Sequence, residues 1–175
     1  MIDFEKNIAE KTLKILKEKT WNALSLDDVL KDKNKKIDIK SKFDLLKNIN
    51  RYVDNKLIYE MQSLENSSTK DMLFEVLMAR FEILQKNRKS FIKIYDNFKK
   101  RPQHFIKLLP SFLESIIVTA ELSKYNVNGL RGTIRLKGLM LIYFATFFQW
   151  MDDKTPALEK TMIVLDKKSS ADSSA

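Results

Sequence analysis

The sequence predicts an all-α protein of about nine helices, and three observations support this class. Glycine is scarce: the 175-residue chain has three, all between Gly129 and Gly138, so hairpins that need glycine turns are disfavoured. Apolar residues recur at intervals of three and four, which is the period of an amphipathic helix. A serine followed three residues later by aspartate, which indicates a helix start, occurs repeatedly. These pairs are Ser25 with Asp28, Ser41 with Asp44, and Ser68 with Asp71.

The composition is that of an ordinary globular protein with a basic surface. Hydrophobic residues make up 44% of the chain and charged residues 31%, and the formal net charge is +9. A basic surface favours binding to DNA or to anionic lipid, although solvated lysine faces without a partner are an equally good explanation. The chain has no cysteine, which excludes disulfides and thiolate metal sites. Its longest apolar run, residues 138–151, is too short to cross a bilayer, so we expect a cytoplasmic protein.

The first sixty residues read as a small three-helix head joined to a long helix. Residues 3–19 are predicted to form an amphipathic helix, and Trp21 follows its end. A short helix is expected from Ser25 to about Lys31, with Leu24 and Val29 as a hydrophobic staple. A long helix is expected from Ser41 to about Met61. Its predicted inner face comprises Phe43, Leu46, Ile49, Val53 and Leu57.

The remaining chain reads as a larger helical body. The segment from Arg101 to Pro102 should end a helix, because the residue before a proline disfavours the helical conformation. The body is expected to close with a long helix that is apolar nearly all round, and then a final helix that starts at Pro156. Residues 169–175 are small and polar and are expected to be disordered. The predicted body helices cover residues 68–86, 90–99, 105–109 (a turn or brief helix), 110–125, 130–152 and 156–168.

This order of parts is accompanied by particular residues in the head and in the body. In the head they are the first helix, Trp21, Leu24-Ser25-Leu26, Val29 and Ser41-Lys42. In the body they are Leu73–Met78, Gly129–Gly132, Lys137-Gly138, Trp150, Asp152-Asp153, Thr155-Pro156 and Leu165-Asp166. Together they resemble the TetR family of one-component bacterial repressors. The later segments are also similar to the C-terminal domain of the lipid-binding accessory protein of ubiquinone biosynthesis.

The resemblance implies a helix-turn-helix-like head over residues 1–48, and a ligand-binding and dimerisation domain over residues 49–168. The stretch between Val29 and Ser41 is shorter than in the family, and after a turn it leaves under two helical turns for the recognition helix. Its lysines could hold phosphates, or could lie in a solvated loop diluted by Asp32 and Asp38. The candidate DNA-binding residues are Ser25, Lys33, Lys35, Lys36, Lys40 and Lys42.

Apolar residues of the body could line a ligand pocket or simply fill a core. Methionine and aromatic side chains adapt to irregular ligands, but they fill gaps in cores equally well. The candidate pocket residues for a small apolar ligand or lipid are Met78, Phe81, Phe112, Ile116, Met140 and Phe144.

The last two helices are expected to pair with their copies in a homodimer, because an apolar long helix needs more cover than one small chain supplies. The candidate interface residues are Tyr143, Phe147, Trp150, Leu158, Met162 and Leu165. A second basic run, residues 86–101, is interleaved with aromatic residues. It could be an amphipathic face on anionic lipid or a protein partner, or a surface helix with its aromatics in the core.

Catalysis is not predicted. The chain has one histidine, His104, and lacks phosphate-loop, nucleophile-elbow and zinc-protease motifs. No metal or cofactor is expected. The resulting prediction is a TetR-like transcriptional regulator whose DNA binding is controlled by a small apolar ligand. The alternative is an accessory protein of quinone biosynthesis that binds a lipid or isoprenoid and does not bind DNA.

Overall fold

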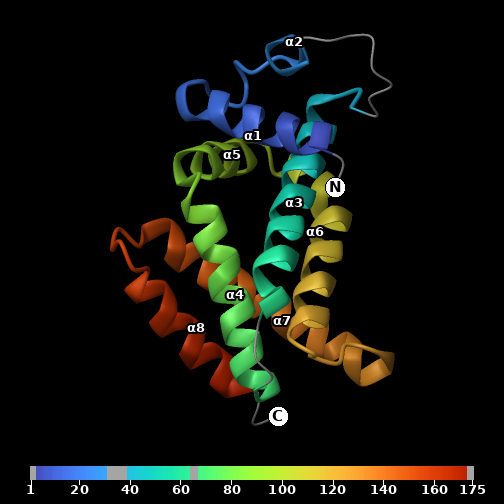
Figure 1. Cartoon of the computed structure of the whole chain (residues 1–175), viewed down its shortest axis with the longest axis vertical. Helices are drawn as coiled ribbons and strands as arrows, with labels where there is room; N and C mark the ends of the chain where they lie inside the picture. The colour runs from blue at the N-terminus through green and yellow to red at the C-terminus, as the bar shows by residue number, and fades with distance from the viewer. Residues whose placement is uncertain (1–2, 31–38, 64–66, 173–175) are drawn as a thin grey trace. The chain divides into compact units, whose positions relative to one another are not determined.

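The computed structural model describes residues 3–30, 39–63 and 67–172, and every regular element within these ranges is a helix. The predicted all-α class is confirmed, with eight α-helices and one short 3₁₀ helix in the described residues (Figure 1). The elements are α1 (Asp3–Glu18), α2 (Leu26–Val29), α3 (Lys42–Glu60), η1 (Met61–Ser63), α4 (Thr69–Gln85), α5 (Arg88–Lys100), α6 (Pro102–Leu122), α7 (Gly129–Asp152) and α8 (Glu159–Asp172).

The chain forms two compact units, and each is discontinuous in sequence. Unit 1 comprises Met1–Lys56 and Leu84–Leu113, and unit 2 comprises Leu57–Ile83 and Glu114–Ala175. The head expected over residues 1–48 therefore belongs to a larger unit that also includes α5 and the first half of α6.

Unit 1 is built around α1, whose apolar stripe is buried. The side chain of Leu13 is 1% exposed, and its main-chain carbonyl accepts a 2.6 Å hydrogen bond from Ser90 Oγ of α5. Lys93 Nζ of α5 donates a 2.8 Å hydrogen bond to the carbonyl of Lys17, near the C-terminus of α1. The bond to Lys17 satisfies one of the last four carbonyls of α1. Both bonds hold α5 alongside α1, and the two helices lie side by side in Figure 1.

A second set of contacts attaches α3 to α1. Asn48 Nδ2 donates a 2.9 Å hydrogen bond to the carbonyl of Glu5, and the Tyr52 hydroxyl lies 3.0 Å from Glu10 Oε1. Burial, and then this carboxylate, raise the pKa of Tyr52 above its ordinary value. The Tyr52 hydroxyl stays protonated and donates to Glu10 at any ordinary pH.

Helix α6 corrects the prediction that a new helix starts at Pro110. The expected brief element at residues 105–109 and the helix after it form one continuous α6, with Pro110 inside it. A proline inside a helix loses one backbone hydrogen bond, so contacts on both sides must hold the helix together. The Phe105 and Phe112 rings lie 6.5 Å apart across Pro110, and Asn50 Nδ2 of α3 donates a 2.8 Å hydrogen bond to the Ser111 carbonyl. By contrast, the predicted end of α5 before Pro102 is confirmed.

Unit 2 has an aromatic core in which α4 and α7 meet. Phe81 of α4 stacks on Tyr143 of α7 with ring centroids 5.5 Å apart, and it lies 6.3 Å from the fully buried Trp150. At the start of α7, Gly132 lies so close to the turn before it that a Cβ atom would overlap the backbone carbonyl of Val127. This contact explains why glycine stands at position 132.

The connection from α7 to α8 is organised by one buried carboxylate. Asp153 is 0% exposed, and its oxygens accept hydrogen bonds from the backbone N–H and the hydroxyl of both Thr155 and Thr161, at 2.6–2.9 Å. Burial alone would raise the pKa of Asp153, but these four hydrogen bonds outweigh it and lower the pKa. The carboxylate is therefore ionised, and it fixes the start of α8.

The final helix begins at Glu159, and not at Pro156 as the sequence suggested. The reason is Leu158, whose φ of 54° is in the left-handed region and cannot belong to a right-handed helix. Its side chain is nevertheless 2% exposed, so packing holds the strained backbone in place. At its other end α8 continues to Asp172, into the segment expected to be a disordered tail; residues 173–175 lie outside the described part of the chain.

Candidate nucleic-acid interface

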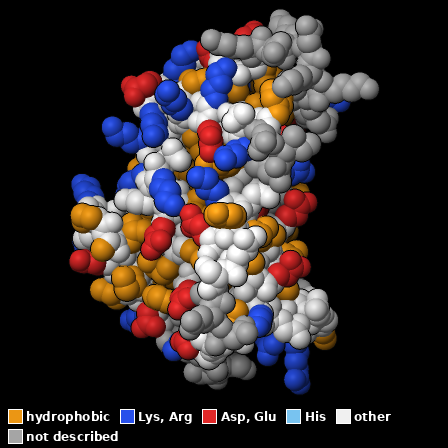
Figure 2. All heavy atoms as spheres, viewed as in Figure 1, with side chains coloured by type: hydrophobic (Ala, Val, Ile, Leu, Met, Phe, Trp, Pro, Cys, Tyr) orange, Lys and Arg blue, Asp and Glu red, His pale blue; other side chains and the backbone are white. Residues whose placement is uncertain are grey.

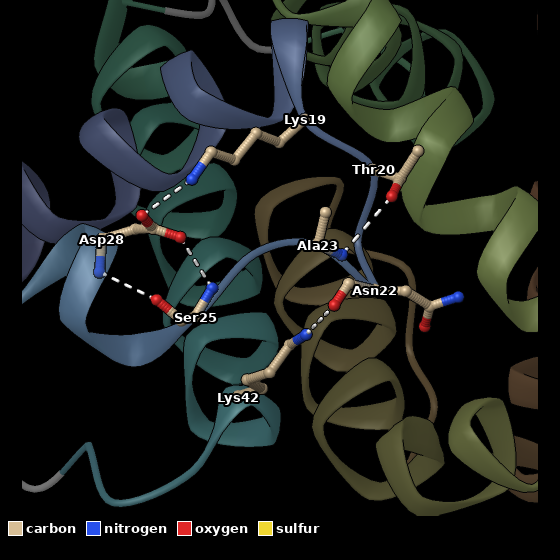
Figure 3. A network of polar contacts seen from close by, with 7 residues as sticks. All are labelled: Lys19, Thr20, Asn22, Ala23, Ser25, Asp28 and Lys42. Atoms are coloured by element: carbon tan, nitrogen blue, oxygen red, sulfur yellow. Dashed lines mark hydrogen bonds and ion pairs between the residues drawn. The ribbon is translucent and has the colours of Figure 1, made fainter.

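The short helix α2 starts with the capping box that the sequence predicted. Ser25 is the N-cap: its hydroxyl accepts a hydrogen bond from the Asp28 N–H at 3.2 Å, and Asp28 Oδ2 accepts one from the Ser25 N–H at 2.8 Å (Figure 3). Leu24 and Val29 are 2% and 4% exposed, as a hydrophobic staple requires. This pairing fixes the start of a helix that has only four residues and could not form in isolation.

An ion pair anchors the same helix to the end of α1. Lys19 Nζ lies 2.8 Å from Asp28 Oδ1. The hydrogen bonds from Lys19 and then from Ser25 lower the pKa of Asp28 to about 2. Asp28 is therefore ionised at neutral pH and pairs with the charge of Lys19.

Lys42 fastens the loop before α2 to the first turn of α3. Its Nζ donates a hydrogen bond to the carbonyl of Asn22 at 3.3 Å (Figure 3). It donates another to the carbonyl of Trp21 at 2.6 Å, and it lies 5.3 Å from the centroid of the Trp21 ring. Burial, followed by the positive charge of Arg101, lowers the pKa of Lys42, while Asp28 raises it. The Lys42 ammonium, predicted to bind DNA, is thus held by contacts inside the head.

The other predicted DNA-binding residues have different surroundings. The Ser25 hydroxyl serves as the cap of α2, although the residue is exposed. Lys40 is exposed, and its backbone N–H donates a 3.1 Å hydrogen bond to Asp44 Oδ2, beside the predicted capping box of Ser41 and Asp44. Lys33, Lys35 and Lys36 lie outside the described residues. We call residues 30–40, between Val29 and Ser41, the reading segment; the structure describes only its two ends, residue 30 and residues 39–40.

The positive charge of the protein is concentrated in unit 1. By sequence, unit 1 carries 22 basic and 11 acidic side chains, a formal charge of +11, while unit 2 carries 10 and 12, a formal charge of −2. Figure 2 shows Lys and Arg side chains gathered over α1 and α5. Consecutive stretches of sequence do not reveal this separation, because the basic run at residues 86–101 packs against α1, far away in the chain.

Five of the six predicted pocket residues lie in the interior of unit 2 or at its edge, and one lies in unit 1. Phe81 and Ile116 are 0% exposed and Met78 is 8% exposed. Phe144 is half-buried and contacts Tyr143 edge to face at 6.0 Å, and Met140 is half-buried. Phe112 belongs to unit 1. Five of the predicted pocket residues therefore belong to unit 2. Two of them, Phe81 and Phe144, both contact the ring of Tyr143.

Most of the predicted interface residues are packed within their own chain. Tyr143, Trp150, Leu158 and Leu165 are 0–5% exposed, Phe147 is half-buried, and Met162 alone is exposed. Besides Met162, unit 2 exposes other large apolar side chains that the sequence did not single out. On α7 and α8 these are Leu130, Ile134, Leu141, Phe148 and Ile163.

No protein-family model matches the chain, and no curated protein is detectably similar to it. Among the described residues, no helix is both long and apolar enough to span a bilayer. In the same part of the chain, no three His, Asp or Glu side chains are grouped in a way that could hold a metal ion. The functional argument therefore depends on the charge and packing of the residues described above.

Proposed function

We propose that this protein is a TetR-like transcriptional regulator that binds DNA through unit 1 as a homodimer. The observation that carries the proposal is the separation of charge, +11 on unit 1 and −2 on unit 2. Binding to the phosphate backbone gains free energy from each cation that replaces a counterion, so a polyanion partner fits unit 1 and not unit 2. The well-capped helices α2 and α3, which flank the lysine-rich segment, further support a reading head.

Control by a small apolar ligand would act through unit 2. Phe81, Met78 and Phe144 supply the adaptable apolar surface that such a ligand prefers. In the dimer, the two heads would have two possible spacings. A ligand shifts the equilibrium between these two conformations only if it binds one of them more tightly than the other. Release from DNA is therefore expected when the ligand favours the spacing that does not match the operator half-sites.

The partner in the homodimer would pack against an exposed apolar stripe of α7. The stripe consists of Leu130, Ile134, Leu141 and Phe148, which are 88%, 69%, 71% and 50% exposed. The last three are seven residues apart, and seven residues return to the same helix face within about 20°. A helix that presents apolar residues every seven positions fits a second helix of the same period.

The charges of α7 favour an antiparallel arrangement of the two copies. The first half of α7 carries Arg131, Arg135 and Lys137, whereas the second half, from Leu141 to Asp152, carries no basic side chain. A two-fold axis at Leu141 places Ile134 opposite Phe148 of the second copy and separates the two basic halves. A parallel pair would instead bring the basic halves together.

A gel-shift assay tests the proposed function. Purified protein is mixed with DNA from upstream of its own gene, and with unrelated DNA of equal length, at two salt concentrations. A regulator should prefer the upstream fragment at both concentrations, with weaker binding at the higher salt. Binding without preference would count against the role of regulator. A co-purified isoprenoid or phospholipid in native mass spectrometry, without DNA binding, would favour the accessory-protein alternative.

A further inference from the structure

Three lysines of α5 lie along one face, and a fourth lysine stands in the turn before the helix. Lys89, Lys93 and Lys100 follow one another at intervals of four and seven residues, which places them on the same side of α5, and Lys86 lies in the turn between α4 and α5. Asp96, which is exposed, is the one acidic residue of this face. From Lys89 to Lys100 the helical part of this set spans about 17 Å at the rise of an α-helix. We call this set the α5 lysine face.

The α5 lysine face continues onto the last turns of α1. Lys93 Nζ donates its 2.8 Å hydrogen bond to the carbonyl of Lys17, so the two residues are neighbours. The side chains of Lys14 and Lys17 are exposed. The bond between Ser90 Oγ and the Leu13 carbonyl fixes the register of the two helices, so these cations are presented by a rigid support.

The other end of α5 lies near the start of α3. Arg101, the C-cap of α5, acts on Lys42 by charge repulsion, and Lys42 stands at the start of α3, just after the reading segment. Lys99, Lys100 and Arg101 are all exposed. Positive charge is thus continuous from the end of α1, along α5, to the start of α3. Like charges held together destabilise a free protein, and an anionic partner removes this cost.

We propose that the α5 lysine face, together with Lys14 and Lys17, is a second binding surface for the phosphate backbone of duplex DNA, separate from the reading segment. The face is long enough to follow several phosphates, because duplex DNA carries one charge per about 1.7 Å of its axis. It contacts phosphates and not bases, so it binds any sequence and positions the head.

Two features of α5 favour duplex DNA over the other polyanions. Binding in a lipid interface needs apolar side chains that insert, and none of the large exposed hydrophobic side chains found in the described residues belongs to α5. Its Ile94 is 7% exposed, while Phe91, Tyr95 and Phe98 are half-buried. Single-stranded nucleic acid prefers exposed aromatic rings for stacking, and α5 does not offer them.

This inference rests on the proposed DNA binding and extends it to a surface that the reading segment does not include. A short reading segment makes few base contacts, so affinity must come from elsewhere. Each phosphate contact contributes a slope of about 0.9 in the salt dependence of binding, equivalent to about eightfold in affinity at 0.1 M salt. Cations of α5 and α1 could therefore supply most of the affinity of each head for DNA.

The test is fluorescence anisotropy with a labelled duplex of random sequence, over a series of salt concentrations. The double variant Lys89→Gln/Lys100→Gln should bind more weakly, by up to about 60-fold at 0.1 M salt, with a log–log slope lower by about 1.8. Asp96→Lys should bind more tightly with a steeper slope, a gain that misfolding cannot produce. Lys160→Gln/Lys167→Gln, which removes the same charge from exposed positions of α8 in unit 2, should bind like the wild type.

The failure of this inference can be told apart from the failure of the proposed function. If the wild-type protein binds no duplex DNA, both are overturned. If the wild type binds, but the α5 variants match it while Lys33→Gln/Lys35→Gln/Lys36→Gln loses binding, only the second surface is overturned. Tight binding of the wild type to vesicles of anionic phospholipid, lost in the α5 variants and without DNA binding, would assign the face to a membrane instead.

Discussion

The Lys42 ammonium of α3 donates a 2.6 Å hydrogen bond to the main-chain carbonyl of Trp21 and lies over the indole ring of the same residue. One side chain therefore closes the loop between α1 and α2 onto α3. Because the ammonium already has protein acceptors, its loss should affect the stability of unit 1 more than the binding of phosphate.

Lys42→Met, which keeps the apolar stem, is expected to lower the free energy of unfolding of unit 1 by about 1–2 kcal/mol. Urea denaturation followed by Trp21 fluorescence, in a Trp150→Phe background, measures it. The matched control is Lys47→Met on the same helix, whose ammonium lies 4.0 Å from Asp44 and is exposed to solvent. This control should change stability by less than about 0.5 kcal/mol. Equal effects of the two variants would contradict the role given to Lys42.

The buried carboxylate of Asp153 predicts a pH dependence of stability. Its pKa is lowered in the folded protein from an ordinary value of 3.8, so the unfolded chain takes up a proton first as the pH falls. The stabilisation is therefore complete well above pH 3.8 and decreases below it, towards the folded-state pKa. Thermal denaturation measured between pH 7 and pH 2.5 should show a melting temperature that falls as the pH drops below about 4.

The variant Asp153→Asn separates this effect from general acid denaturation. At pH 7 it should cost about 3 kcal/mol, since charge-assisted hydrogen bonds to Thr155 and Thr161 are weakened or lost. The difference in melting temperature between the variant and the wild type should then shrink as the pH falls below 4, because protonation removes the same charge from the wild type. A difference that stays constant down to pH 2.5 would refute the carboxylate as its source.

Two residues share the same unusual backbone conformation but should respond in opposite ways to glycine. Lys124 and Leu158 both have φ of 54°. Lys124 is exposed and follows the end of α6, where the Tyr125 N–H donates a 2.8 Å hydrogen bond to the Ala120 carbonyl. Lys124→Gly should stabilise the protein by about 0.5–1 kcal/mol, because glycine adopts this conformation without strain.

Leu158→Gly relieves the same strain but removes a side chain that is 2% exposed. The lost packing exceeds the relief, so a net destabilisation of about 2 kcal/mol or more is expected. Calorimetric melting of both variants checks the pair of predictions. Destabilisation by Lys124→Gly would show that its backbone angle is not a source of strain. A neutral Leu158→Gly would show that the lost packing does not exceed the relief of strain.

The exposed stripe of α7 predicts a variant that dissociates the homodimer. Leu141→Glu places two carboxylates against each other at the proposed two-fold axis, so it should yield a monomer that retains its helical circular dichroism. Sedimentation velocity at micromolar concentration measures the change. Arg135→Glu, at an exposed position on another face of α7, serves as the control and should remain dimeric. A wild-type protein that sediments as a monomer would overturn the proposed pairing.

The sequence predicted best those features that depend on neighbours in the chain. The boxes at Ser25 and Ser41 need only a hydroxyl and a carboxylate three residues apart, and both form as expected. The third pair is formed in part, since the Asp71 N–H donates to the Ser68 hydroxyl at 3.2 Å. The break before Pro102 is similarly local. Pro110 was misread because packing from α3 and the Phe105 and Phe112 rings, which lie outside its own sequence window, decides whether the helix continues.

The outward face of α7 could not be predicted for a related reason. Residues 138–151 are apolar nearly all round, so no period separates the residues that are buried from those that are exposed. Tyr143 and Trp150 turn out to be buried against Phe81, whereas Leu141 and Phe148 face outward. The concentration of positive charge in unit 1 could not be predicted either, because it results from the packing of α5 against α1, which is distant in the sequence.

The packing of α5 against α1 also limits which fragments of the protein can fold by themselves. A fragment of the first sixty residues would keep the reading segment but would lack α5. It would therefore lose the hydrogen bond from Ser90 to the Leu13 carbonyl, and the face of α1 that α5 covers would be exposed to solvent. Such a fragment should collapse or aggregate, so the head cannot be fused to another protein as an autonomous cassette. A chimera would have to transplant residues 84–113 along with it.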